Sequence, residues 1–154
     1  MHIRLLAVGT RMPGWVQQGY ADYAKRMPRS CSLELIEIAH GKRQRGADRA
    51  MADEGKAMLA RVHADDAVIA LDVKGKPWST EQLADNMHGW LADGRDRALL
   101  IGGPDGLATD CLARAGQRWS LSALTLPHPL VRVIVAEQLY RAYSLLNNHP
   151  YHRG

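Results

Sequence analysis

Short apolar runs alternate with longer stretches of helical period along this chain, and this alternation constrains its fold more than any other feature. Each apolar run has the length of a strand, and apolar residues then recur every three or four positions. Strands that alternate with helices favour a mainly parallel sheet with helices on both faces. The chain is therefore predicted to have an α/β fold. The predicted strands are 3–8, 33–38, 67–71, 98–101 and 119–126, and the predicted helices are about 13–27, 48–61, 79 onward, 107–115 and 129–146.

The length and composition of the chain suit one globular domain. A chain of 154 residues can bury roughly 70% of the surface that it exposes when unfolded. A composition of 46% hydrophobic and 23% charged residues argues against disorder. No apolar run approaches the roughly 20 residues of a membrane span, and the N-terminus lacks the features of a signal peptide. We therefore expect a single cytoplasmic domain over residues 1–154, with no membrane partner.

Several common kinds of site find no support in the sequence. Cys31 and Cys111 stand apart from each other and from any suitably spaced histidine, which favours neither a disulfide nor a zinc site. His128, His149 and His152 lack a helical HxxxH spacing, so no metal is expected. The sequence also lacks the nucleophile signature GxSxG, which makes a covalent hydrolase a poor fit.

Three loops are expected to lie at the edge of the sheet where ligands bind. In open α/β sheets this edge is formed by the carboxyl ends of the strands, which points to residues 72–78, 102–106 and 121–128. The glycines of 102–106 would let a ligand approach the backbone, although a tight turn between strand and helix accounts for them equally. The segment 121–129 combines leucines with hydroxyls and prolines. It would suit a flat heterocycle such as adenine, or it is a strand that ends irregularly.

Basic residues gather between positions 25 and 49, and the formal net charge of the chain is +4. Such a region forms a phosphate-binding patch, or it is simply a solvated helix end and loop. The predicted helix 129–146 has apolar residues around most of its circumference. This pattern indicates burial on more than one side, either at a subunit interface or in the core of one subunit.

The end of the chain carries unusually dense chemistry for a terminus. Two histidines, a tyrosine and an arginine fall within residues 149–153, directly after the predicted final helix. Chain ends are usually soft and chemically plain. We therefore interpret this tail as part of a site.

Taken together, these segments closely resemble the RlmH family, the ribosomal large subunit pseudouridine N3-methyltransferases of the SPOUT superfamily. The resemblance extends over the whole chain and depends on the combination of motifs. The matching segments are Val8-Gly9-Thr10, Gly41-Lys42-Arg43, 71–76, 101–106, 119–132 and 148–153.

The resemblance implies a SPOUT fold with a C-terminal trefoil knot that holds S-adenosylmethionine. It also implies a homodimer that acts on 23S rRNA within the assembled ribosome, without a metal. The implied cofactor-binding residues are Leu71, Gly102, Gly103, Leu121, Ser122, Ala123, Leu124, Thr125, Leu126 and Pro127.

Methyl transfer to N3 of a pseudouridine requires alignment of donor and acceptor and the removal of one proton. His152 is the first candidate to accept that proton and His128 the second, because a histidine titrates near neutral pH; solvent is the alternative acceptor. Arg153 is the third residue expected to take part in catalysis. The residues expected to contact RNA are Arg132, Arg141, Tyr151, Lys42 and Arg43.

The chain departs from the family pattern at Gly154, where an acidic residue is expected after Arg153. This departure bears on any role of a carboxylate in the tail and leaves the knot segments unaffected. Two other classes compete with the methyltransferase. A non-catalytic ribosome-binding factor would share the fold and the basic patch, and a small-molecule α/β enzyme would be a monomer that is active without RNA.

Overall fold

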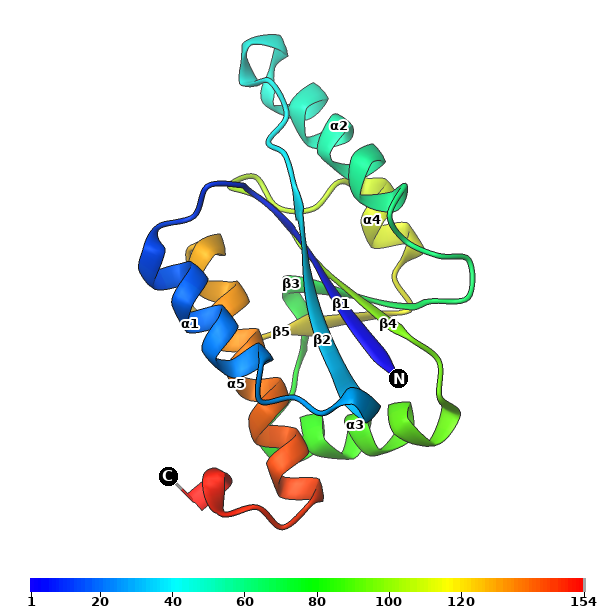
Figure 1. The fold of residues 1–154 in the computed structure, drawn as a ribbon. Coiled ribbons are helices and arrows are strands. Elements are labelled where there is room, and N and C mark those ends of the chain that lie inside the picture. The colour runs from blue at the N-terminus through cyan, green and yellow to red at the C-terminus, as the bar shows by residue number, and fades with distance from the viewer. Residues whose placement is uncertain (154) are drawn as a thin grey trace.

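The computed structural model describes residues 1–153 and contains a five-stranded sheet between two layers of helices (Figure 1). The strand order is β2-β1-β4-β3-β5, and every neighbouring pair is parallel. The predicted α/β fold with a parallel sheet is therefore confirmed. The strands are β1 His2–Val8, β2 Ser32–Ile38, β3 Ala67–Pro77, β4 Arg97–Ile101 and β5 Gln117–Ser120.

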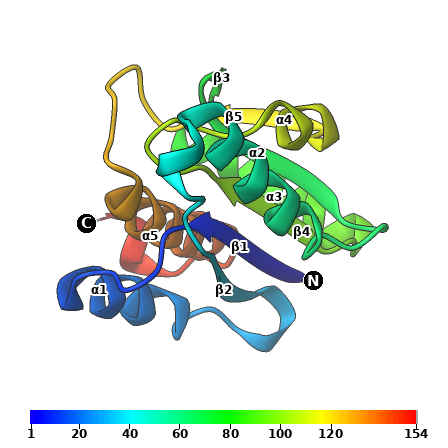
Figure 2. The ribbon, with the colours of Figure 1, turned by 90° about the horizontal axis from the view of Figure 1, so that it is seen from above.

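Five α-helices cover the sheet, three on one face and two on the other (Figure 2). The first layer holds α1, α3 and α5, and the second holds α2 and α4. Single 3₁₀ turns occur at Arg29–Cys31, Arg43–Arg45 and Pro150–Arg153. The helices are α1 Gly14–Ala24, α2 Ala47–Leu59, α3 Thr80–Asp93, α4 Thr109–Arg114 and α5 His128–Leu146.

The alternation of side chains along each strand builds a core on both faces of the sheet. In β1, Ile3 and Leu5 pack with α1, α3 and α5, whereas Leu6 and Val8 pack with α2 and α4. All four side chains are buried. A central strand that is buried on both faces reads as a continuous apolar run, which is why β1 was predictable.

The connections run in a regular pattern that creates a crevice beside β4. Connections that step toward β2 use the α1 and α3 face, and those that step toward β5 use the α2 and α4 face. A uniform crossover hand requires this division. Helices on one face follow β1 and β3, and a helix on the other face follows β4. The chain therefore leaves β4 and its two neighbouring strands on opposite faces, and in such sheets ligands bind where this happens, at the carboxyl ends of the strands.

Two predicted boundaries at the carboxyl edge are wrong. The segment 72–78 was expected as a loop, but β3 continues to Pro77 after an irregularity in which Leu71 and Lys76 both pair with Trp119. The last strand was expected to reach position 126, but β5 ends at Ser120. There the Ser120 hydroxyl donates to the Ser122 carbonyl at 3.1 Å, and the Leu124 N–H donates to the Ser122 hydroxyl at 2.9 Å. Such local bonds replace the ladder of a strand.

Helix α3 begins where the sequence predicts. Ser79 and Gln82 form a capping box, with the Gln82 N–H donating to the Ser79 hydroxyl at 3.1 Å and the Ser79 N–H donating to the Gln82 side-chain oxygen at 2.8 Å. Cys31 and Cys111 are buried and unpaired, as expected, and burial raises the pKa of each thiol to about 11. Among the helices of residues 1–153, none has the length and hydropathy needed to cross a membrane.

Candidate functional site

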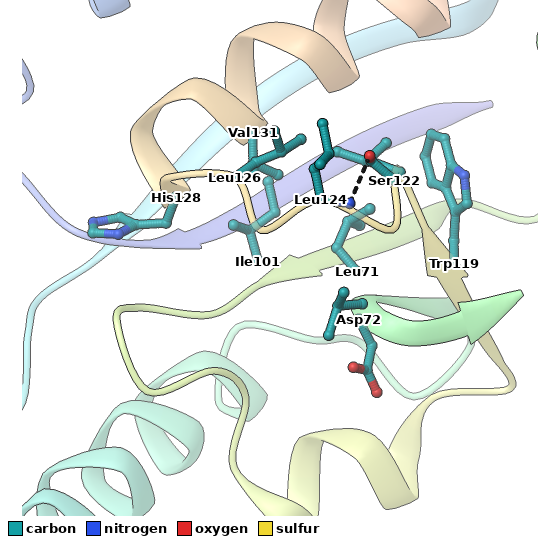
Figure 3. A pocket seen from close by; sticks show the side chains of 11 residues that line it. Leu71, Asp72, Ile101, Trp119, Ser122, Leu124, Leu126, His128 and Val131 are labelled. Atoms are coloured by element: carbon teal, nitrogen blue, oxygen red, sulfur yellow. Dashed lines mark hydrogen bonds between the residues drawn. The ribbon is translucent and has the colours of Figure 1, made fainter. Parts of the chain in front are cut away.

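A cavity of about 140 Å³ lies at the carboxyl ends of β4 and β5 and beside the irregularity within β3, against the start of α5 (Figure 3). Its walls come from residues 71–73 of β3, from the end of β4, and from the end of β5 with the segment after it. These three regions lie far apart in the sequence. The lining residues are Leu71, Asp72, Val73, Ile101, Trp119, Leu121, Ser122, Leu124, Leu126, His128 and Val131.

The cavity has mainly apolar walls and a few polar groups. Figure 3 shows Trp119 at one end of the row of lining side chains and His128 at the other. Leu124 is 73% exposed at the mouth, where a surface leucine would gain from contact with a ligand. Apolar walls with a few placed polar groups are typical of sites for small organic ligands. The arrangement therefore fits the predicted flat heterocycle.

Trp119 also borders a second cavity, which lies beside α3 and α5. Its ring stacks on Trp78 with the centroids 5.1 Å apart, and its indole N–H is buried without a hydrogen-bond partner among the described residues. This second cavity has a volume of about 300 Å³. Its lining residues are Trp78, Ser79, Thr80, Leu83, Trp119, Leu121, Ile134 and Gln138.

The glycine turn after β4 lies beside the first cavity, but its glycines serve the turn itself. A Cβ on Gly102 would lie 2.4 Å from the carbonyl carbon of Gly106, and one on Gly103 would lie 3.0 Å from Val8. The Gly106 N–H donates to the Gly103 carbonyl at 3.0 Å and closes the turn. Ile101 lines the cavity, whereas Gly102 and Gly103 are not among its lining residues. The interpretation as a tight turn therefore accounts for both glycines.

His128, the first residue of α5, lines the cavity, and its surroundings favour the neutral form of the ring. Burial lowers the pKa of His128, and the nearby His40 and Arg132 lower it further, while Glu54 opposes them. The rings of His40 and His128 meet edge to face with centroids 5.9 Å apart. His40 was not predicted as a site residue, because nothing in the sequence shows that the end of β2 approaches the start of α5.

Arg132 was expected to contact RNA, but its position does not suit that role. Its side chain is 1% exposed, and one guanidinium nitrogen lies 2.9 Å from Glu37. The other terminal nitrogen donates to the carbonyls of Val8 and Gly9 at 3.4 and 3.3 Å. Arg132 therefore ties α5 to the ends of β1 and β2, because burial of its charge requires these partners.

The expected RNA contacts Lys42 and Arg43 lie in a basic loop between β2 and α2. Lys42 is exposed, whereas Arg43 bridges two carboxylates, those of Glu54 at 2.8 Å and Asp105 at 3.1 Å. Sequence reasoning missed Glu54, although a signal was present. It falls in the buried stripe of α2, four residues after Ala50 and four before Met58, where a charged residue requires a buried partner.

The C-terminal tail is docked on α5 through Tyr151. Its hydroxyl donates to Glu137 at 2.8 Å, and its ring packs on Tyr140 with centroids 4.7 Å apart and under the Arg141 guanidinium at 5.0 Å. Glu137 also accepts from Arg141 at 2.7 Å. The expected contacts Tyr151 and Arg141 are thus used within the chain to hold the tail.

His152 and Arg153 lie at the opposite end of α5 from the cavity. Helix α5 has 19 residues, so His128 and the helix end are about 28 Å apart. In Figure 1 the tail lies near the end of the molecule where β1 and β2 begin. The structure therefore brings residues of the predicted segments 72–78 and 121–128 together with Ile101 at the cavity, but it does not bring the tail to them within one chain. Gly154 lies outside the described residues.

Within residues 1–153, no group of three or more His, Cys, Asp or Glu side chains is placed to hold a metal ion. The polar groups at the carboxyl edge are instead a neutral histidine, a serine and an aspartate around an apolar cavity. Such a site can bind and orient an organic ligand and accept a proton at a histidine nitrogen.

Comparison with known proteins gives consistent matches over the full chain. Residues 1–152 match the family described as predicted SPOUT methyltransferase. A protein from Methylococcus capsulatus named ribosomal RNA large subunit methyltransferase H is 60% identical over 99% of this chain and 100% of its own length. A protein of the same name from Alkalilimnicola ehrlichii is 61% identical over 100% of both.

The fold also has counterparts among solved structures. A probable methyltransferase from Bordetella pertussis superposes with a TM-score of 0.57 at 20% identity, covering 91% of this chain and 93% of that one. At this identity the likeness concerns the fold alone.

Proposed function

This chain belongs to the SPOUT methyltransferase family, and we propose that it transfers a methyl group from S-adenosylmethionine to 23S rRNA of the large ribosomal subunit. The observation that carries the proposal is identity of about 60% over the full length with proteins named for this activity. The cavity at the carboxyl edge supports the proposal. A methyltransferase needs a binding site for its methyl donor, and this cavity, lined by three segments distant in sequence, lies where ligands bind in such sheets.

The cavity fits S-adenosylmethionine in its chemistry. Apolar side chains such as Leu71 and Leu126 would enclose the adenine, and the irregular backbone of 121–127 would hydrogen-bond its edge. The neutral state of His128 keeps a positive charge away from a cationic ligand. When bound, the cofactor supplies a methyl group on a sulfonium with a good leaving group. In this proposal the segment 121–127 also belongs to the trefoil knot of the superfamily.

The proposed acceptor is N3 of a pseudouridine, and His152 accepts its proton. His128 is the second candidate, since it already lines the cavity with a neutral ring that can take up a proton. Arg153 lies next to His152 and is exposed, so its guanidinium can hold a phosphate or the base edge. No metal enters this step.

The position of the tail supports a homodimer. Tyr151 fixes the tail on α5 through Glu137, and no described residue of the tail lines the cavity of the same chain. In this proposal the tail therefore meets the donor site of a second copy. In the proposed dimer, His152 and Arg153 of one subunit act beside the cavity of the other. A ribosomal substrate implies a cytoplasmic enzyme.

The decisive experiment uses ribosomes that lack the modification, incubated with the protein and labelled S-adenosylmethionine, followed by mapping of the methylated nucleotide. We expect one labelled pseudouridine in 23S rRNA of assembled ribosomes and little label in free rRNA. A label on another molecule, or equal rates on ribosomes and free rRNA, would contradict the proposal.

The competing function is a non-catalytic ribosome-binding factor of the same fold, which calorimetry with S-adenosylmethionine separates. The enzyme should bind the cofactor, and His152→Ala should lower the methylation rate while leaving this binding unchanged. A protein that binds ribosomes but not the cofactor would support the factor instead.

A further inference from the structure

The basic loop, residues 41–46 between β2 and α2, lies beside the rim of the donor cavity. His40 leads from the end of β2 into this loop, and its ring contacts the ring of His128, which lines the cavity. Lys42 and Arg45 are exposed, and no ion pair to either is present within residues 1–153. Two cations without an ion pair among the described residues therefore follow His40 closely along the chain.

Arg43, between these two cations, is committed to the protein itself. One terminal nitrogen lies 2.8 Å from Glu54 on α2, and the other lies 3.1 Å from Asp105 in the glycine turn. The Arg43 bridge, Glu54–Arg43–Asp105, thus connects the basic loop to both neighbouring segments. A guanidinium is suited to this task because its donors are fixed in a planar fork.

Glu54 anchors the bridge from the interior. Its side chain is 3% exposed, and the oxygen that accepts from Arg43 also accepts the Gly41 N–H at 2.9 Å. Its other oxygen is buried without a hydrogen-bond partner among the described residues, and lies 3.7 Å from the position of a Cβ on Gly103. A buried carboxylate with so few partners depends strongly on Arg43, because an uncompensated charge in the interior is costly.

Gly41 allows the loop to approach α2 this closely. A Cβ at Gly41 would lie 2.2 Å from the backbone oxygen of Ala50, a contact that a side chain cannot make. The start of the loop is therefore held by backbone packing as well as by Glu54. Both features fix the direction in which the following residues leave the sheet.

We propose that Glu54, Arg43 and Asp105 are positioning residues that hold the basic loop at the rim of the donor cavity, where Lys42 and Arg45 bind phosphates of the RNA strand that carries the target base. The inference rests on the proposed function. It changes the role expected of Arg43, which acts through the loop and does not contact a phosphate.

The sharpest test uses substitutions for which the change in net charge and the loss of the Arg43 bridge predict opposite changes in ribosome binding. Glu54→Gln and Asp105→Asn each make the protein more positive by one unit. General electrostatics then predicts tighter binding of ribosomes. The Arg43 bridge predicts the reverse, a rise in KM for ribosomes of about tenfold, equivalent to the loss of one charge-assisted hydrogen bond. The affinity for S-adenosylmethionine should not change.

Asp93→Asn is the matched control. Asp93 forms an ion pair with Arg97 at 2.7 Å and has a side chain that is 43% exposed, against 42% for Asp105. It lies before β4, at the opposite end of that strand from the glycine turn. This variant has the same change in net charge, so its KM for ribosomes should stay the same or fall.

Arg43→Lys separates positioning from direct phosphate contact. Lysine keeps the charge but cannot span two carboxylates, so it should raise KM for ribosomes as Asp105→Asn does and speed amide hydrogen exchange in residues 41–46. Lys42→Ala and Arg45→Ala should each reduce the slope of log affinity against log salt by about 0.7–0.9. Neither should affect exchange in the loop.

Tighter ribosome binding by Asp105→Asn, or a wild-type KM for Arg43→Lys with unchanged exchange, would overturn the inference. Failure of the proposed function itself has a different signature, namely a wild-type protein that does not methylate ribosomes. Hydrogen exchange in the loop does not depend on activity, so the two failures are distinguishable.

Discussion

At the scale of single residues, His128 connects the folded structure to the charge of the proposed donor. Burial, His40 and Arg132 all lower the pKa of His128 from its ordinary value of 6.5. The folded protein therefore favours the neutral ring more than the unfolded chain does. This contribution to stability is present above pH 6.5 and is lost as the pH falls through the lowered pKa.

Cofactor affinity should depend on pH in the same direction as stability, because a protonated His128 would repel the sulfonium. We expect the affinity for S-adenosylmethionine to fall as the pH falls through the lowered pKa of His128, and the affinity for S-adenosylhomocysteine, which lacks the sulfonium charge, to fall less. Calorimetry over this range measures both, with His128→Gln as the variant that should lose the difference. Parallel pH profiles for the two ligands would show that His128 does not sense the charge.

At the same scale, Tyr151 holds the tail through one hydroxyl. Burial raises the pKa of this phenol, as do the neighbouring Tyr23 and Glu137, so the hydroxyl remains a donor to Glu137 throughout the neutral and moderately alkaline range. Tyr151→Phe removes the donor but keeps the ring that packs on Tyr140 and Arg141.

We expect Tyr151→Phe to weaken docking of the tail by about 1 kcal/mol, the usual net contribution of such a bond. Amide exchange in residues 149–153 should become faster and the methylation rate should fall, with cofactor affinity unchanged. Tyr143→Phe is a suitable control, since it makes the same change at a tyrosine of α5. Equal protection of the tail in Tyr151→Phe and wild type would exclude the docking role of the hydroxyl.

At the scale of elements, the glycine turn sets the shape of the carboxyl edge. Gly102→Ala would place a methyl group 2.4 Å from the Gly106 carbonyl carbon, so the turn would have to open. We expect a loss of stability of about 2 kcal/mol and a clear fall in affinity for S-adenosylmethionine, because Ile101 would move with the turn.

Gly89→Ala provides the control within α3, since a Cβ there meets nothing within 4 Å. It should stabilise the protein by roughly 0.5–1 kcal/mol through the better helix propensity of alanine, without an effect on binding. Thermal unfolding at fixed protein concentration and calorimetry measure the two effects. A Gly102→Ala protein as stable as wild type would show that the turn tolerates a side chain.

The elements that the sequence predicted well are those whose signals are local. Buried strands such as β1 show as apolar runs, and the start of α3 shows as a capping box at Ser79. The end of β5 was missed because hydrogen bonds of Ser120 and Ser122 decide it. The extension of β3 was missed because it depends on a contact between distant segments. Position 75 approaches the backbone of Arg118 so closely that only a glycine fits there.

The same distinction applies to the site. The carboxyl-edge rule found two of the segments that line the cavity, 72–78 and 121–128, because topology alone brings them together. The third predicted segment, 102–106, contributes no lining residue. Arg132 was misjudged because its partner Glu37 lies 95 positions away in the sequence, and its charge suggested exposure. Glu54 and His40 were missed for the same kind of reason, since their partners lie on other elements.

At the scale of the whole molecule, the separation of tail and cavity makes a prediction about mixed dimers. One subunit would carry His152→Ala, and the other Leu124→Arg, a pocket variant at a position 73% exposed and thus tolerant of the change. If each tail serves the partner's cavity, the mixed dimer retains one intact site of two and about half of the wild-type rate. If each tail served its own cavity, the mixed dimer would be inactive.

Mixed dimers purified with two different affinity tags allow this measurement, with each homodimer as a control. Both homodimers should be inactive, His152→Ala with normal cofactor affinity and Leu124→Arg with weakened affinity. Inactivity of the mixed dimer, with both subunits folded, would refute the shared site.

Helix α5 begins at the cavity with His128 and carries the docked tail at its far end. It therefore acts as a spacer whose residue count sets both the reach and the angular phase of the tail. One inserted residue would advance the tail by about 1.5 Å and swing it by about 100° around the axis. An insertion or deletion in α5 would therefore preserve the direction of the tail only if it amounted to about a whole number of helical turns.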